Sequence, residues 1–225
     1  PIHGVDGHDL YEVEGGGDRI PVRLLTFVEG HPLATHDHLA PELVADLGRL
    51  AARTSLALAS FDHPGLDRTV QWDLQIAADV VAALLGSVAD RSRQALVADR
   101  TAAAGERLAD VVDALRVQAI HGDVTDDNVG GRLDEAGRVR PDGVIDCGDL
   151  MRSWLVADLA VTCASVLRHT PDDPFAVLPA VRAFDAANLW GAFKTHCVAT
   201  SFKRAARRVV GADTPISLYA LRHSL

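Results

Sequence analysis

Acidic and amide side chains gather in two short stretches of the chain, and their spacing suits chemistry on a phosphate group. The first stretch, 120–128 (IHGDVTDDN), places Asp123 and Asn128 on a loop after an apolar lead-in. The second, 144–149 (VIDCGD), places Asp146 at the end of a short apolar strand. Phosphoryl transfer needs one carboxylate to accept the proton of the attacking hydroxyl, and oxygen ligands for Mg²⁺. We therefore assign Asp123 as the base and Asn128 and Asp146 as metal ligands.

An ordinary turn is the competing explanation for the first stretch, because Asp and Asn tolerate turn geometry and cap helices. Either stretch alone leaves that explanation open, whereas the order and spacing of both together favour the catalytic interpretation. Asp149 also has two interpretations. It touches the site, or it caps a helix that we predict to begin near Met151, and we favour the cap.

The same residues resemble a known enzyme family. His-Gly-Asp with a later Asn, followed by Ile-Asp-x-Gly-Asp, is similar to the motifs of the aminoglycoside phosphotransferase/choline kinase family, small-molecule kinases with a protein-kinase-like fold. The resemblance implies that Asp123 is the catalytic base, that Asn128 and Asp146 bind magnesium, and that His121 braces the catalytic loop. Gly122 stands where protein kinases carry Arg, which favours a metabolite kinase.

Four local pieces resemble the hydroxylysine kinase branch of that family: VRLLTF (22–27), FDHP (61–64), WDL (72–74) and HGDVTDDN (121–128). The branch implies Mg²⁺-dependent transfer of a phosphate from ATP or GTP to a hydroxyl of a small amino-acid or amino-alcohol substrate such as hydroxylysine. An acidic pocket would attract the ammonium group of such a substrate, and Asp126, Asp127 and Asp149 are the candidates. Related bacterial domains also occur joined to a class-III aminotransferase, so fusion to or association with other enzyme domains stays open.

The elements that must position these residues are expected to form an α+β, protein-kinase-like fold with two lobes. Residues 1–30 would be the remnant of a truncated small lobe, with a hairpin turned at Gly15–Gly17, a last strand over 23–28 and the hinge. By the resemblance, the backbone of Phe27, Val28 and Glu29 at the hinge would meet the purine edge of the nucleotide. Residues 31–225 would be the mostly helical large lobe with the catalytic and metal-binding loops.

Apolar periodicity predicts the helices of the large lobe, and alternation with turn signals predicts its strands. A strand over 117–120 leads into the catalytic loop, and a hairpin returns Asp146 to the neighbourhood of Asn128. Asp158 lies in an apolar helix, where a carboxylate is costly unless it is paired. From the resemblance we favour a bracing role in the catalytic loop over exposure at a wet surface. The predicted helices begin near Asp37 and Trp72 and cover 92–115, 154–167, 175–187 and 188–210, and the hairpin strands cover 129–133 and 139–145.

Composition excludes several classes of partner. The net charge of −9 argues against nucleic acid, because no general basic surface would neutralise phosphates. No apolar run reaches the length of a membrane span and no signal peptide opens the chain, so no membrane partner is expected. The three scattered cysteines indicate reduced thiols and a cytoplasmic location. His31, His36 and His38 cluster, but without closed ligand spacing we disfavour a zinc site.

One departure from the family concerns lysine. A kinase of this fold needs a Lys that reaches the nucleotide phosphates, yet the only lysines here are Lys194 and Lys203. A fragment that lacks the first strands is one explanation, and loss of nucleotide chemistry is the other. The alternatives to a hydroxylated-amine kinase are therefore an aminoglycoside-type antibiotic phosphotransferase and a nucleotide-incompetent, kinase-like binding domain. The basic cluster at 203–208 is most simply explained by the negative end of a helix dipole.

Overall fold

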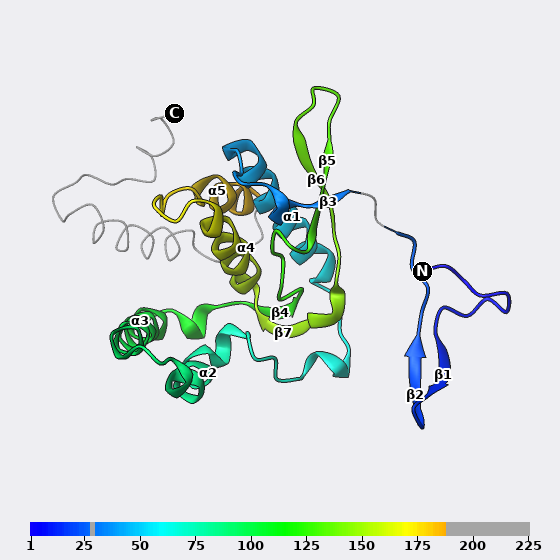
Figure 1. The fold of residues 1–225 in the computed structure, drawn as a ribbon, viewed down its shortest axis with the longest axis horizontal. Coiled ribbons are helices and arrows are strands. Elements are labelled where there is room, and N and C mark those ends of the chain that lie inside the picture. Colours follow the sequence, from blue (N-terminus) through cyan, green and yellow to red (C-terminus); the bar gives the residue numbers. More distant parts are fainter. Residues whose placement is uncertain (28–29, 188–225) are drawn as a thin grey trace.

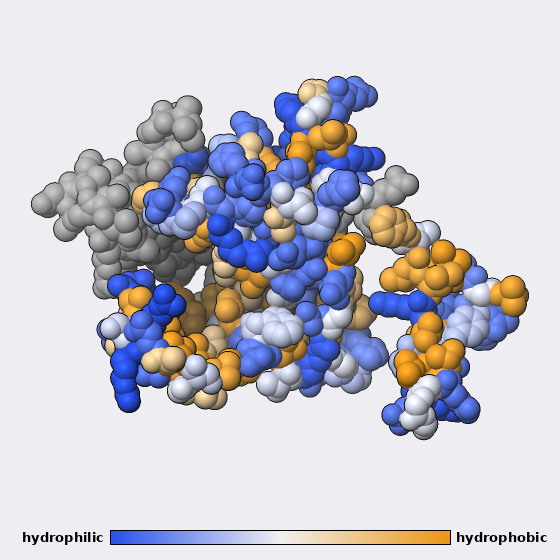
Figure 2. Space-filling model, viewed as in Figure 1, coloured by the Kyte–Doolittle hydropathy of each residue, from blue (hydrophilic) through white to orange (hydrophobic). Residues whose placement is uncertain are grey.

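The chain opens with a hairpin that forms a two-stranded sheet of its own. The structure is a computed structural model that describes residues 1–27 and 30–187 (Figure 1). Strands β1 (Tyr11–Gly15) and β2 (Asp18–Val22) pair antiparallel, and Gly16 and Gly17 form the expected turn at φ 64° and 94°. Positive φ at both central residues matches the right-handed twist of a hairpin. Figure 1 shows the hairpin set apart from the helical body, and Figure 2 shows apolar side chains on its surface.

The strand expected over 23–28 is not formed by the residues that the structure describes. Residues 23–27 belong to no helix or strand, and the Leu24 carbonyl accepts a hydrogen bond from the Ile2 amide at 2.8 Å. The apolar run favours extended backbone, but a strand also needs a neighbour to accept its hydrogen bonds. The expectation was therefore wrong for 23–27. Residues 28 and 29 lie outside the described part of the chain.

A three-stranded sheet carries the second acidic motif. Strand β3 (His31–Pro32) pairs with β5 (Val129–Leu133), and β5 pairs with β6 (Val139–Val144), all antiparallel. The predicted hairpin is confirmed, with a turn closed by a hydrogen bond from the Gly137 amide to the Asp134 carbonyl. Beyond the ladder, the Ile145 amide donates to the Asn128 carbonyl at 2.9 Å. This bond brings the start of β5 next to the residue that precedes Asp146.

A second ribbon holds the first acidic motif. The predicted strand over 117–120 is confirmed as β4 (Val117–Ile120). It pairs antiparallel with β7 (Met151–Trp154), and Ile120 lies opposite Met151. The helix expected near Met151 was wrong, because those residues complete the ladder of β4 instead. Helix α4 (Leu155–His169) begins only after the strand, so Asp149 does not cap it. Asp149 lies in a single 3-10 turn, Cys147–Asp149, whose N-cap is Asp146.

The core lies between three helices. Helix α1 (Pro41–Leu58) packs against α4 and against α5 (Leu178–Ala186). Gly48 permits the close contact of α1 with α5, since a Cβ there would lie 2.2 Å from the Ala180 carbonyl oxygen. Helix α1 begins at Pro41 rather than near Asp37, because proline is favoured at the first helical position and 33–35 form a 3-10 turn. The largest buried side chains include Leu33, Leu47, Val124, Leu155, Val166 and Phe184.

Two further helices form an exposed pair beside the core (Figure 1). Helix α2 (Ala77–Leu84) follows a 3-10 turn that Asp73 caps, and α3 (Arg91–Ala109) ends six residues before the predicted boundary. No residue of either helix is fully buried. The predicted helix over 188–210, with its basic end, lies outside the described residues. Within residues 1–27 and 30–187, every helix is too short or too polar to span a lipid bilayer.

Candidate active site

The loop 121–128 is held by a buried carboxylate from a helix far along the chain. Asp158 of α4 is fully buried, and its two oxygens accept hydrogen bonds from the amides of His121 at 3.2 Å and Gly122 at 2.8 Å. Ser55 of α1 donates to the same carboxylate at 3.2 Å. Burial raises the pKa of Asp158, while these hydrogen bonds oppose that rise. These contacts fit the bracing role that the resemblance implies for Asp158.

Two further residues of α4, in the turns after Asp158, also form hydrogen bonds with the loop. The Thr162 hydroxyl donates to the Val124 carbonyl at 2.7 Å, and the Ser165 hydroxyl accepts from the Asp126 amide at 2.9 Å. Asp158, Thr162 and Ser165 lie on one face of the helix because their spacing follows the helical repeat. One face of α4 therefore sets the path of the loop backbone.

The His121 ring contacts both acidic motifs. Its ring is buried, with Nδ1 accepting from the Asp123 amide at 3.3 Å and Nε2 lying 3.1 Å from the Ile145 carbonyl oxygen. A neutral imidazole whose Nδ1 accepts carries its proton on Nε2, which can then donate to that carbonyl. His121 does not line the pocket described below. Its contacts fit the bracing role that the resemblance implies, rather than direct contact with a substrate.

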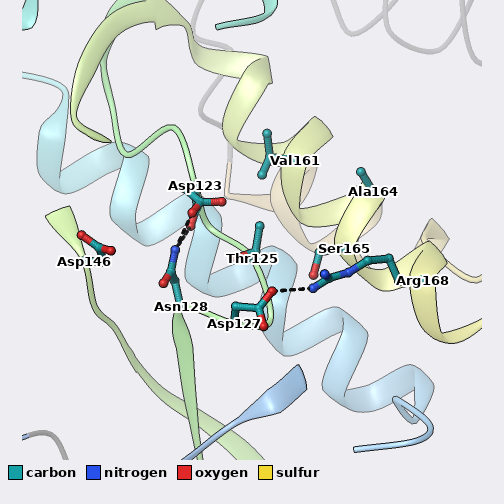
Figure 3. Close-up of a pocket in the computed structure, with 9 residues that line it drawn as sticks. All are labelled: Asp123, Thr125, Asp127, Asn128, Asp146, Val161, Ala164, Ser165 and Arg168. Atoms are coloured by element: carbon teal, nitrogen blue, oxygen red, sulfur yellow. Dashed lines mark hydrogen bonds and ion pairs between the residues drawn. The ribbon is translucent and has the colours of Figure 1, made fainter. Parts of the chain in front are cut away.

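The predicted base and both predicted metal ligands line one pocket (Figure 3). The pocket has a volume of about 440 Å³, within the range of small-molecule sites. The Asn128 amide nitrogen donates to Asp123 Oδ2 at 2.6 Å and to the Asp123 carbonyl at 3.1 Å. Since the nitrogen is committed to Asp123, the amide oxygen of Asn128 is the atom that can face a cation. The lining residues are Asp123, Thr125, Asp127, Asn128, Asp146, Val161, Ala164, Ser165 and Arg168.

Asp146 has an unusual backbone. Its φ of 60° and ψ of 65° lie in the left-handed region, and among the described residues it is the only non-glycine with positive φ. Asp adopts this region more readily than most residues, and such conformations concentrate at functional sites. The side chain accepts a hydrogen bond from the Gly148 amide at 3.2 Å, which fixes its direction beside the pocket.

Asp123 is half-buried at the pocket wall, and its pKa is raised above the ordinary value. Burial is the main cause, and the nearby Asp149 carboxylate adds to it, whereas the hydrogen bond from Asn128 acts in the opposite direction. A carboxylate whose pKa is raised is a stronger proton acceptor than an exposed aspartate.

The three acidic residues assigned to substrate binding occupy different environments. Asp127 lines the pocket and pairs with Arg168 at 2.7 Å. The Asp126 side chain is 1% exposed and points under the loop, so it does not face the pocket. Asp149 is absent from the lining and lies 4.0 Å from Arg68. Of the three, only Asp127 is placed to meet a ligand in the pocket.

The path of the loop backbone separates these side chains. Asp123, Thr125 and Asp127 point into the pocket, whereas Val124 and Asp126 are buried. The backbone turns between these residues, because the Thr125 amide donates to the Asp123 carbonyl at 2.9 Å and the Asn128 amide donates to the Thr125 carbonyl at 3.1 Å. The bonds of Asp126 with Ser165 and Arg168 of α4 decide which of the two neighbours is buried, so the sequence of the loop alone does not separate Asp126 from Asp127.

Asp126 belongs to a buried polar network beneath the loop. Its carboxylate accepts hydrogen bonds from Ser165 and Arg168, and His169 Nε2 lies within hydrogen-bond distance of it. Burial acts to raise the pKa of Asp126, but the hydrogen bonds from Ser165, His169 and Arg168 outweigh it and lower the pKa. The sequence reasoning missed Ser165 and Arg168 as site residues. Their helical spacing from Val161, on the face of α4 that meets the loop, is the signal that could have found them.

The donor set suits a magnesium ion that is shared with phosphates. Among residues 1–27 and 30–187, no group of three or more His, Cys, Asp or Glu side chains could hold a metal. Mg²⁺ binds through one or two carboxylates together with substrate phosphates and water, and amide oxygens are hard ligands of the same kind. Asn128 and Asp146 could supply two such oxygen ligands, and the remaining ligands would come from nucleotide phosphates and water.

Of the three residues predicted to meet the purine edge, only Phe27 lies among the described residues. Phe27 is 88% exposed and does not line it, and Val28 and Glu29 lie outside the described residues.

The sequence of this chain is similar to that of a known enzyme family over most of its length. A model of the phosphotransferase enzyme family matches residues 3–192. Hydroxylysine kinase from Mus musculus is 25% identical over 148 residues, which cover 62% of this chain and 39% of the relative. The chain thus spans about two fifths of the length of that relative.

Two solved structures share the fold. Amicoumacin kinase hAmiN, in complex with AMP-PNP, Ca²⁺ and Ami, matches with a TM-score of 0.56 and 15% identity, over 89% of this chain and 59% of its own. A microcompartment-associated aminopropanol kinase matches with a TM-score of 0.53 and 16% identity, over 91% and 71% of the two chains. At these identities the likeness concerns the fold, and it confirms the expected α+β, protein-kinase-like architecture.

Proposed function

Because this chain belongs to the phosphotransferase enzyme family, we propose that it transfers the γ-phosphate of ATP or GTP to a hydroxyl of a small amino-acid or amino-alcohol substrate. Hydroxylysine is the model acceptor, a choice supported by the mouse relative. The observation that carries the proposal is the convergence of Asp123, Asn128 and Asp146 on one pocket.

In the proposed reaction the acceptor hydroxyl lies against Asp123. Its oxygen bonds to the γ-phosphorus while the bond from that phosphorus to the bridging oxygen breaks, and the hydroxyl proton moves to the Asp123 carboxylate. The nucleoside diphosphate leaves with the bridging oxygen. The hydrogen bond from Asn128 holds Asp123 in one orientation, so little reorganisation is needed when the hydroxyl arrives.

Mg²⁺ would be held by the Asn128 amide oxygen and the Asp146 carboxylate, and when bound it neutralises the charge of the phosphates. The contacts of His121 with the Asp123 amide and the Ile145 carbonyl support a fixed separation between the base and this metal position.

We also propose that residues 1–30 belong to the small lobe and 31–225 to the large lobe, with the backbone of 27–29 meeting the purine edge. The pairing of β3 with β5 supports this boundary, because it joins residues 31–32 to the body that carries the catalytic loop. A cytoplasmic location is supported by Cys147 and Cys163, which are free thiols in the structure.

A second candidate function is a kinase-like binding domain without nucleotide chemistry. The observation that favours it is the absence of any lysine before Lys194 in the sequence, since family kinases clamp the nucleotide phosphates with a lysine. The two candidates differ in whether the protein binds nucleotide in the presence of Mg²⁺.

Release of nucleoside diphosphate by the full-length protein tests the proposal, with Mg²⁺, ATP or GTP, and a panel of 5-hydroxylysine, homoserine, choline and an aminoglycoside. We expect Asp123→Asn to lower kcat by roughly a hundredfold to ten-thousandfold, because it removes the proton acceptor, without changing the thermal midpoint by circular dichroism. Asp99→Asn, at an exposed site on α3, is the matched control. Turnover retained in Asp123→Asn would contradict the catalytic assignment. A folded protein that neither turns over nor binds nucleotide would favour the binding domain.

A further inference from the structure

A pair of opposite charges lies at the end of the pocket away from the metal position. Arg168 Nη2 donates to Asp127 Oδ2 at 2.7 Å, and both side chains line the pocket. Figure 3 shows Asp146 on one side of Asp123 and Asn128, and the Asp127–Arg168 pair on the other. A substrate whose hydroxyl meets Asp123 and whose phosphate donor lies toward Asp146 therefore extends its remaining atoms toward this pair.

The wall between the two ends is partly apolar. Val161 and Ala164 of α4 line the pocket between Asp123 and Arg168 (Figure 3). Apolar side chains fit methylene groups, and they offer no hydrogen bonds to a polyhydroxylated ring. The pocket thus combines a polar end for the hydroxyl, an apolar middle and a charged end.

The charged end is held in place from below. The same Arg168 nitrogen that bonds to Asp127 also donates to the buried carboxylate of Asp126, while the Arg168 side chain is still 56% exposed. Asp127 is 59% exposed, so both charges are accessible to a ligand. Anchoring a flexible arginine before a ligand arrives lowers the entropy that binding must overcome.

We infer that Asp127 and Arg168 bind the two charged groups of a hydroxy-α-amino acid. Asp127 binds the ammonium group, and Arg168 binds the carboxylate. Arg is suited to this role because its planar guanidinium matches a carboxylate in a two-bond contact. An amino alcohol would satisfy only Asp127. The inference rests on the proposed function and narrows its acceptor to amino acids.

Two matched acceptors test the inference in the full-length protein: 5-hydroxylysine and its decarboxylated counterpart, 1,5-diaminopentan-2-ol. We expect kcat/KM for the amino acid to exceed that for the amino alcohol by roughly tenfold or more, mostly through KM, as for one charged hydrogen-bonded contact. Arg168→Gln should lower the ratio of the two kcat/KM values toward one. Asp127→Asn should lower kcat/KM for both acceptors, because both carry an amine.

The ratio separates recognition from structural damage, because a loosened loop would slow both acceptors alike and leave the ratio unchanged. A ratio that is equal in wild type and Arg168→Gln, or a wild-type preference for the amino alcohol, would overturn the inference. If no acceptor is phosphorylated, the proposed function fails. The binding of the same two compounds, measured by calorimetry, then still tests the inference about Asp127 and Arg168. Preferential binding of 5-hydroxylysine that Arg168→Gln abolishes would support the inference, and equal binding would refute it.

Discussion

The β1–β2 hairpin and the loop 121–128 are both short segments bent at glycines with positive φ, yet they are stabilised in opposite ways. The hairpin pairs only strands that are adjacent in sequence, and all its residues are exposed except the half-buried Gly15. The loop is bonded to residues of α4 that lie 36 to 39 positions further along the chain. Local pairing defines one segment, whereas long-range side-chain contacts define the other.

The exposed fractions of the side chains differ between the two segments in the same way. Tyr11, Val13, Ile20 and Val22 form one face of the hairpin and are 37% to 46% exposed, whereas His121, Asp126 and Asp158 are almost completely buried. A two-stranded hairpin alone is marginally stable in water. We therefore expect the loop to share the stability of the core and the hairpin to open separately.

The largest effect on stability should come from the network under the loop. Asp126→Ala removes a buried acceptor for Ser165, Arg168 and His169, and we expect a loss of about 3 kcal/mol in the free energy of unfolding. Asp127→Ala is the control on the same loop, and should cost less than about 1 kcal/mol because the pair is solvent-exposed. Urea denaturation of both variants measures the difference, and equal losses would contradict the assigned role of the buried network.

The difference in stability between wild type and Asp126→Ala has an expected pH dependence. The pKa of Asp126 is lowered in the folded protein, so its stabilisation is present above the ordinary aspartate value and is lost as the pH falls through the lower, folded pKa. The stability gap between wild type and Asp126→Ala should therefore narrow as the pH falls below about 4. Urea denaturation at pH 3 to 7 checks the sign, and a gap that widens in acid would be inconsistent with it.

Alanine substitutions at Gly122 and Gly137 should have smaller effects on stability than Asp126→Ala, and these effects should differ from each other. Gly122 and Gly137 have φ of 82° and 72°, but a Cβ at Gly122 would lie 2.3 Å from Met151 and 3.1 Å from the Asp149 carbonyl oxygen, whereas Gly137 faces open space. We expect Gly137→Ala to cost about 1 kcal/mol from backbone strain alone. Gly122→Ala should cost about 2–3 kcal/mol and lower activity, because packing adds to strain. Thermal unfolding with the kinase assay measures both, and equal costs would mean that Met151 moves aside freely.

The smallest effect on global stability should come from the hairpin. Gly17→Ala strains a turn residue at φ 94°, so amide exchange in β1 and β2 should accelerate. The free energy of unfolding of the body should change by less than about 0.5 kcal/mol, since the hairpin forms its own sheet. Hydrogen exchange of 121–128 provides the internal comparison. A matching acceleration there would show that the two segments unfold together.

The sequence predicts features that depend on local pairing better than features that depend on long-range contacts. The β5–β6 hairpin, strand β4 and the convergence of Asp146 with Asn128 were predictable, because turn residues and motif spacing are local signals. Strand β7 was not, since its apolar residues run directly into an apolar helix and only the partner strand β4 makes them a strand. The opposite orientations of Asp126 and Asp127 likewise depend on α4.

The pairing of Ile120 with Met151 has a mechanical consequence. The loop of the base leaves one strand of this ribbon, and the Asp146 turn enters the other, at the same end. A rigid movement of the ribbon displaces both motifs together, so it preserves the distance between the proposed proton acceptor, Asp123, and the proposed metal ligand, Asp146.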